Sequence, residues 1–285
     1  MLELVRIIVL LAIATLYAVF DVFNKREVPN AFVYACLAVG ILVTFTYGLA
    51  IAEISLLLAL AIGAGGYLVY RAGYWGAGDF FELATISLLV PIQPAPLLNH
   101  FNQLGLPFIV SVFIAAGFAA VWIVPLYYLI VKKNKAMRKT KTMRIYKFLG
   151  ILLFVLYLLL LLFAYVLFGV TWDKLAIIAL IGIPSAITLA YEEEITSNMV
   201  ERIYPSRLEA GDIIAVNIMQ RREIKYFKSK YAGFGRLATG EMISKLKNVR
   251  KKLPVYKHAA PLTVFVLIGI VVSLLFGNIV LYLLY

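Results

Sequence analysis

Long apolar runs dominate the chain and are separated by short polar segments. Most of the runs approach the length of about 20 residues that a helix needs to cross a bilayer. Their apolar residues surround the whole helix, as is typical where lipid faces the outside. The pattern therefore predicts an all-α polytopic membrane protein with eight transmembrane helices, at residues 3–20, 31–50, 54–70, 80–98, 107–131, 148–168, 175–191 and 261–284.

The fourth run differs from the others because prolines interrupt it. Its clean apolar part, Phe80 to Val90, is too short for a complete crossing. Pro91, Pro94 and Pro96 follow, and proline disrupts helical hydrogen bonding. The segment after Val90 is therefore expected to be kinked, broken or irregular.

Composition excludes a soluble globule. The 285 residues are 63% hydrophobic and only 15% charged, with a mean hydropathy of +0.93, whereas soluble domains contain about 25% charged residues. The single cysteine, Cys36, excludes an internal disulfide and a zinc site of the CxxC type. No cleavable signal peptide is evident, so we expect the first run to be a retained helix.

Basic residues predict the orientation. The chain has 27 Lys and Arg against 15 Asp and Glu, a net charge of +12. If the N-terminus is outside and all eight runs cross, 25 of the 27 basic residues fall in inside loops, as the positive-inside rule requires. The densest loop, Lys132 to Lys147, lies between two apolar runs. Contact with anionic lipid is therefore favoured there over nucleic-acid binding.

The one sizeable polar segment spans residues 192–258 and predicts a small cytoplasmic α+β domain. A strand is expected at Asp212–Ile218, and an amphipathic helix at Glu241–Leu253 with Thr239 as a possible cap. The chain then divides into a transmembrane core, this domain and a C-terminal transmembrane helix, at residues 1–191, 192–258 and 259–285. A solvated module lying on the membrane and a direct role in binding substrate remain equally open for the domain.

Acidic residues near membrane depth are costly and are therefore functional candidates. Glu53 falls at an outside boundary, where water solvates it. Asp21 ends the first run on the inside, and Asp79 and Glu82 begin the fourth run from that same side. The topology therefore permits Asp21 and Asp79 to meet.

Two carboxyl groups close together share a proton, so that one acts as a general base and the other as a general acid. The base can activate water against a peptide carbonyl while the acid protonates the carbonyl oxygen. The two histidines, His100 and His258, are predicted outside and at a domain edge, so a histidine-dependent triad is not expected. The pattern favours aspartic-protease chemistry, with the acid and base roles left open.

Two short motifs surround these residues. Asp21 is followed by a Lys-Arg-Glu-Val-Pro-Asn loop, and Gly76-Ala77-Gly78-Asp79 opens the fourth run. Gly76 and Gly78 permit backbone angles and close approaches that a side chain would block. Together the motifs resemble those of the GxGD family of type IV prepilin peptidases, most closely its archaeal prepilin and preflagellin branch, over roughly residues 1–131.

The resemblance implies a membrane aspartic endopeptidase with a core of about six helices. It would remove positively charged class III leader peptides from pilin-like or archaeal flagellin precursors at the cytoplasmic face of the cell membrane, with Asp21 and Asp79 as the catalytic pair and no cofactor. Bacterial relatives that also methylate the product carry paired cysteines. Cys36 alone cannot supply these, so cleavage without methylation is expected.

Bacterial relatives often have a lysine soon after GxGD, whereas this chain has Phe80, Phe81 and Glu82 there. Glu82 can tune the pKa of Asp79, contact the basic leader, or face a polar gap, and the last is favoured.

Two other function classes remain. A proton-coupled transporter would also use membrane carboxylates, but should place acids near midplane in late helices, where this chain has none. A non-enzymatic assembly scaffold would leave both motifs unexplained.

Overall fold

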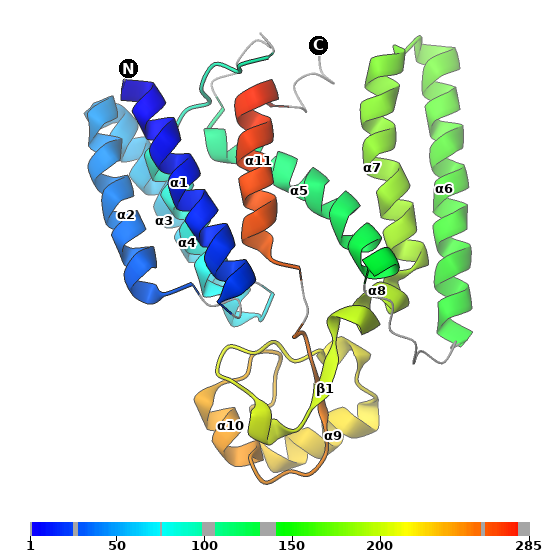
Figure 1. The fold of residues 1–285 in the computed structure, drawn as a ribbon. Helices are drawn as coiled ribbons and strands as arrows, with labels where there is room; N and C mark the ends of the chain where they lie inside the picture. The colour runs from blue at the N-terminus through cyan, green and yellow to red at the C-terminus, as the bar shows by residue number, and fades with distance from the viewer. Residues whose placement is uncertain are drawn as a thin grey trace.

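The computed structural model describes residues 2–24, 28–74, 76–98, 106–131, 141–257 and 260–278. All eight predicted apolar runs contain helix, and a small domain lies at one end of the helices (Figure 1). The eight helices are α1 (Leu2–Phe23), α2 (Asn30–Thr44), α3 (Leu49–Arg71), α4 (Ala77–Leu89), α5 (Phe108–Leu126), α6 (Lys141–Phe168), α7 (Trp172–Ala190) and α11 (Leu262–Phe276). Several predictions fall outside the described residues, namely those on 25–27, 132–140, 279–284, His100 and His258.

Five helices among the described residues are long and apolar enough to cross a membrane. They are Leu2–Phe23, Asn30–Tyr47, Leu49–Arg71, Phe108–Ile130 and Lys147–Leu167. A sixth is obtained if α7 and the short α8 (Glu192–Met199), which meet at a bend of 74°, count as one span. The predicted total of eight also needs α4 and α11, which are shorter, and it stays a prediction.

Helix α4 is the centre of the bundle. It packs against α1, α2, α3, α5 and α11, and most of its residues are buried. Its 13 residues give a length of about 20 Å, less than the bilayer core of about 30 Å. Beyond Val90 the chain is irregular, as predicted, and it is tied to α11 by the Leu97 N–H, which donates to the Leu274 carbonyl at 3.1 Å.

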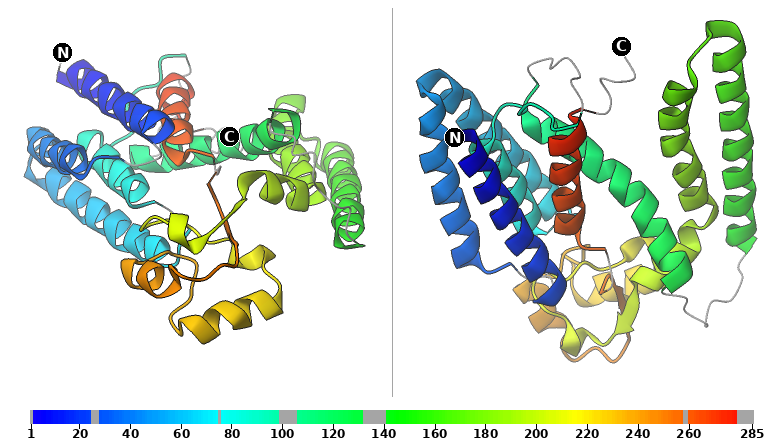
Figure 2. Two further views of the ribbon diagram at one scale, coloured as in Figure 1. Left: turned by 60° about the horizontal axis from the view of Figure 1, so that its bottom comes forward. Right: turned by 45° about the horizontal axis from the view of Figure 1, so that its top comes forward.

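Helix α11 lies between α1 and α5, although it comes last in the chain (Figures 1 and 2). Gly269 allows this close packing, because a Cβ there would lie 2.5 Å from the Val112 carbonyl oxygen of α5. Val266 and Ile270 join the buried apolar cluster formed with α1, α4 and α5. Helices α6 and α7 stand apart as a hairpin that reaches this group through α5.

The small domain contains β1 (Glu201–Ile203), α9 (Arg221–Lys230), α10 (Gly240–Leu246) and β2 (Leu253–Val255), with single 3-10 turns at Pro205–Arg207 and Val216–Ile218. Strands β1 and β2 pair antiparallel. Its own apolar core includes the fully buried Phe227, Leu246, Leu253 and Val255. The described part of residues 192–258 contains both helices and strands, as predicted. Two of these elements lie at positions other than the predicted ones.

Two elements of the domain differ from the prediction. The strand expected at Asp212–Ile218 is wrong: only Ile213 and Ile214 form isolated bridges, and a 3-10 turn follows. The helix expected at Glu241–Leu253 ends at Leu246, because Leu253–Val255 pairs with β1 instead. The cap prediction is confirmed, since the Thr239 hydroxyl accepts a hydrogen bond from the Met242 N–H at 3.2 Å.

Candidate active site

Three helix ends meet on the side of the bundle that faces the small domain: the C-terminal end of α1 and the N-terminal ends of α4 and α11 (Figure 1). The first carries Asp21, the second Asp79 and the third Thr263. Glu53 lies instead near the start of α3, at the opposite end, where its side chain is exposed. The structure thus brings the two predicted aspartates to one end and leaves Glu53 apart.

Asp21 is buried although it lies in the last turn of α1. The buried residues of α1 include Ala14, Tyr17 and Asp21, spaced so that they lie on one face of the helix. That face packs against α4 and α11. The hydroxyl of Thr263, itself buried, donates a hydrogen bond of 2.8 Å to Asp21 Oδ2. The carboxyl group of Asp21 therefore has a fixed donor on one oxygen.

Asp79 occupies the third position of α4, and its side chain folds back over the start of the helix. Its Oδ2 accepts a hydrogen bond of 2.8 Å from the backbone N–H of Gly76, the residue that caps the helix. This arrangement is the acidic half of a capping box, and it satisfies one of the free N–H groups at a helix start. Like Asp21, Asp79 has one carboxyl oxygen held by a donor.

At Gly76 and Gly78, the two glycines predicted to shape this loop, neighbouring atoms lie too close to leave easy room for a side chain. Gly76 has ordinary extended angles (φ −75°, ψ 157°), and a Cβ on it would lie 3.2 Å from Asp79 Oδ2. Gly78 lies within the first turn of α4, where a Cβ would be 3.2 Å from Val28 Cγ2. The glycine of this loop with a positive φ is Gly73, at 73°. Unusual backbone angles are therefore needed at Gly73, and tight packing accounts for Gly76 and Gly78.

Glu82 extends the acidic group one turn into α4. Its side chain is 1% exposed, and neither carboxyl oxygen has a hydrogen-bond partner among the described residues. Asp21 and Asp79 both lie close enough for their charges to act on Glu82, and the charges of Asp21 and Asp79 also act on each other. The three predicted roles of Glu82, in tuning Asp79, contacting the leader or facing a polar gap, stay predictions.

Sequence reasoning missed Thr263 and the surroundings of the loop before Asp79. Thr263 opens an ordinary apolar run, and nothing in its local pattern indicates a partner 242 positions earlier. Arg236 of the small domain stacks over the Tyr74 ring, with the guanidinium carbon 4.1 Å from the ring centroid. A basic residue in a polar domain carries no signal that would identify such a contact.

The chemistry available to this group of residues is proton transfer between carboxyl groups. Within the part of the chain that the structure describes, no cluster of three or more His, Cys, Asp and Glu side chains is arranged to hold a metal ion. Asp21 and Asp79 each keep Oδ1 outside the hydrogen bonds described above. Two such oxygens can bind and activate a water molecule between them.

Comparison with known families supports the resemblance found from the motifs. Residues 8–124, less than half of the chain, match the family model of the type IV leader peptidase family. This range contains Asp21, Gly76, Gly78, Asp79 and Glu82, and lies within the predicted range of similarity, residues 1–131. No curated protein and no solved structure matches the chain significantly. The N-terminal part of the chain, which carries both motifs, is therefore similar to this family.

Proposed function

We propose that this chain is a membrane-embedded aspartic endopeptidase in which Asp21 and Asp79 are the catalytic pair. The observation that carries the proposal is their convergence: two carboxylates, 58 positions apart in the sequence, come from the two motif halves to one end of the helix bundle, and each has one oxygen held by a donor. The match to the type IV leader peptidase family covers both residues.

The reaction follows from the shared proton. One carboxylate takes a proton from water as the water attacks the peptide carbonyl, and the protonated partner donates a proton to the carbonyl oxygen. Collapse of the tetrahedral intermediate then transfers a proton to the leaving amine and restores the pair. The Thr263 hydroxyl and the Gly76 N–H hold Oδ2 of the two groups, which leaves Oδ1 of each for water and substrate. Either aspartate can begin as the base.

The substrates are precursors of pilin-like proteins or archaeal flagellins with a short, positively charged class III leader. Gly76 and Gly78 shape the loop next to Asp79, and Glu82 tunes the pair or contacts the basic leader. By its motifs the chain resembles the archaeal prepilin and preflagellin branch. With Cys36 as the single cysteine, the paired cysteines of the methylating relatives are absent, and the product leaves unmethylated.

The site opens toward the cytoplasm of a multi-pass cell-membrane protein whose N-terminus is outside. The small domain follows α8 and, in this arrangement, lies on the cytoplasmic side with most of the basic residues. Those basic segments contact anionic lipid headgroups, whose negative potential attracts Lys and Arg near the surface. Nucleic acid has no part in this function.

The experiment is cleavage by the purified protein of a precursor with a class III leader, detected by mass spectrometry of the new N-terminus. Asp21→Asn and Asp79→Asn should each lower the rate by about 100- to 10,000-fold, the usual loss when a general acid or base is removed. Glu53→Gln, which changes an exposed carboxylate at the opposite end, should cleave normally. Cleavage at the wild-type rate by either aspartate variant would show that the pair is wrong.

A further inference from the structure

Thr263 connects the last helix of the chain to the first. Its hydroxyl donates to Asp21 Oδ2 at 2.8 Å, and both side chains are buried. Thr263 lies outside the range matched by the type IV leader peptidase family, which ends at residue 124. The bond therefore brings a residue from the distal part of the chain into direct contact with a predicted catalytic carboxylate.

The position of Thr263 is fixed by the packing of α11. Gly269, two turns further along, lies so close to α5 that a Cβ would be 3.0 Å from Ala116 Cβ. Val266 and Ile270 are buried in the same cluster as Leu10 and Ala14 of α1. A rotation of α11 would break these contacts, so the helix presents Thr263 to Asp21 in one orientation.

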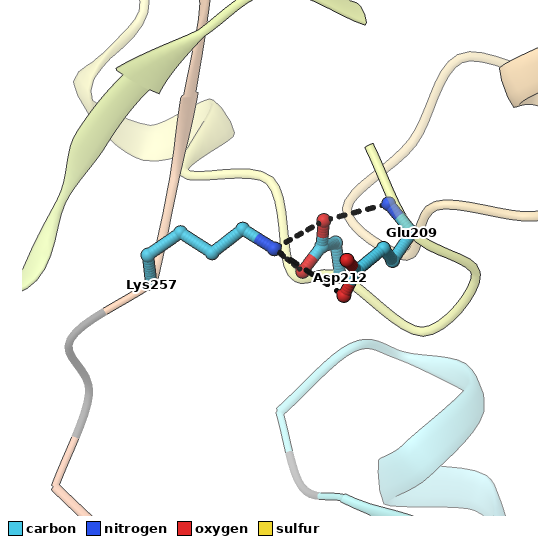
Figure 3. A network of polar contacts seen from close by, with 3 residues as sticks. All are labelled: Glu209, Asp212 and Lys257. Carbon is cyan, nitrogen blue, oxygen red and sulfur yellow. Dashed lines mark hydrogen bonds and ion pairs between the residues drawn. The ribbon is translucent and has the colours of Figure 1, made fainter. Parts of the chain in front are cut away.

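The small domain anchors the chain just before α11. Lys257 Nζ contacts both carboxyl oxygens of Asp212, at 2.7 and 2.9 Å (Figure 3). Asp212 Oδ2 also accepts the Glu209 N–H at 2.9 Å, so the carboxylate that receives Lys257 is itself oriented. Lys257 is six positions before Thr263. The domain therefore fixes the chain at Lys257, a short distance in sequence before the start of α11.

The same domain contacts the loop before Asp79. Gly73 has a φ of 73°, and a Cβ there would lie 3.0 Å from Arg236 Cβ. The guanidinium group of Arg236 covers the ring of the next residue, Tyr74. The domain thus contacts Gly73 and Tyr74, shortly before Asp79, and is anchored at Lys257, shortly before Thr263.

We propose that Thr263 is a positioning residue for Asp21, and that the small domain supports the catalytic pair by holding the chain before α11 and at Gly73 and Tyr74. The proposal rests on the proposed function. The donated hydrogen bond fixes the plane of the Asp21 carboxyl group, so that Oδ1 faces the reacting water, and it stabilises the charged carboxylate.

The test replaces the hydroxyl while keeping the shape of the side chain. Thr263→Val should lower kcat about 10- to 100-fold, the effect of one hydrogen bond to a charged group, with KM nearly unchanged. Thr263→Ser keeps the donor and should restore the rate.

The matched control is Thr44→Val, which removes a buried hydroxyl that has no hydrogen-bond partner among the described residues. This control should keep the wild-type kcat and KM. A Thr263→Val enzyme with a wild-type kcat, or a Thr263→Ser enzyme as impaired as Thr263→Val, would overturn the proposal. Equal thermal unfolding of the three Thr263 forms separates positioning from loss of the fold.

A spectroscopic measurement separates this inference from the proposed function. Infrared difference spectra of the wild type and Asp21→Asn identify the carboxylate stretch of Asp21 without any substrate. Thr263→Val should shift that band, and Thr44→Val should not. If Thr263→Val shifts the band but the wild type cleaves no precursor, the proposed function alone is contradicted. If the wild type cleaves normally but Thr263→Val leaves the band unshifted, the role of Thr263 alone is contradicted.

Discussion

The side chain of Val28 lies against the backbone of Gly78, so closely that a Cβ on Gly78 would be 3.2 Å from Val28 Cγ2 and 3.4 Å from Val28 Cβ. Val28 belongs to the loop that follows Asp21, and Gly78 precedes Asp79 directly. Val28 also packs against the buried cluster of Tyr17, Val33 and Cys36. The two motif halves are therefore in contact through this pair, and a change at one should affect the other.

Gly78→Ala should lower cleavage by about fivefold or more while thermal stability stays close to wild type. The new methyl group pushes Val28 and the start of α4 apart, and overpacking in a filled site costs about 1–3 kcal/mol. The higher helix propensity of alanine, about 1 kcal/mol over glycine, offsets much of that cost for the fold. Steady-state cleavage and thermal unfolding of the purified variant measure the two effects separately.

A second substitution at Val28 tests whether steric crowding causes the loss of activity in Gly78→Ala. Val28→Ala combined with Gly78→Ala should recover most of the activity, because the smaller side chain makes room for the added methyl group. Gly63→Ala is the matched control, since no atom lies within 4 Å of a Cβ at that helical position. If Gly78→Ala cleaves as fast as Gly63→Ala, the contact between the loops does not position Asp79.

The positions of the helices could be predicted from the sequence because lipid-facing helices leave a continuous apolar signal. All eight expected runs contain helix, and Pro91 correctly marked the end of α4. The predicted topology permitted Asp21 and Asp79 to meet, and the structure has both at the same end of the bundle. The bond to Thr263 could not be predicted, because it depends on how α11 inserts beside α1, and local patterns carry no information on the order of helices in a bundle.

The small domain was harder to predict for a different physical reason. Strands β1 and β2 have three residues each, and such short strands are defined by their partner more than by their own alternation. Ile214 alternates as a strand residue should, yet it makes only a single bridge to Val255. Thr239 was found because a helix cap is a local feature that depends on a few adjacent residues.

Glu82→Leu should raise thermal stability and lower cleavage. A buried carboxyl group whose oxygens lack hydrogen-bond partners costs about 1–3 kcal/mol relative to an apolar side chain of similar size. Because Glu82 neighbours Asp21 and Asp79, we expect it to contribute to cleavage at the expense of stability. Unfolding temperature and initial cleavage rate, measured on the same preparation, test both parts.

Glu53→Leu provides the comparison for Glu82, since it removes an exposed carboxylate and should change neither quantity. Glu82→Gln keeps the shape of the side chain but not its charge. A loss of activity in Glu82→Gln as well as in Glu82→Leu would assign the role to the carboxyl group. A more stable Glu82→Leu enzyme with full activity would instead show that Glu82 has no part in cleavage.

The contact between Arg236 and Tyr74 should affect catalysis from outside the acidic group. Arg236→Ala and Tyr74→Ala should each slow cleavage about two- to fivefold, the range expected for one exposed cation–π contact. Because both changes remove the same contact, the double variant should be no slower than either single one. Tyr74→Phe keeps the ring and should remain active.

Lys252 supplies the control for this contact. It lies over the ring of Tyr204 at 5.2 Å, within the same domain. Lys252→Ala removes a comparable charge and ring contact without touching the loop before Asp79, so cleavage should stay normal. Additive losses in the Arg236 and Tyr74 double variant would mean that the two residues act independently and that the domain does not hold the loop through them.

Cysteine labelling should place the small domain on the cytoplasmic side. Cys36 is buried and is the single cysteine of the chain, so Cys36→Ala provides a background without reactive thiols. Lys228, on α9, and Leu49, at the opposite end of the helices, are both exposed. In intact cells, a membrane-impermeant maleimide should label Leu49→Cys and should reach Lys228→Cys only after permeabilisation. The reverse pattern would place the basic residues of the domain outside and overturn the orientation that the positive-inside rule predicts.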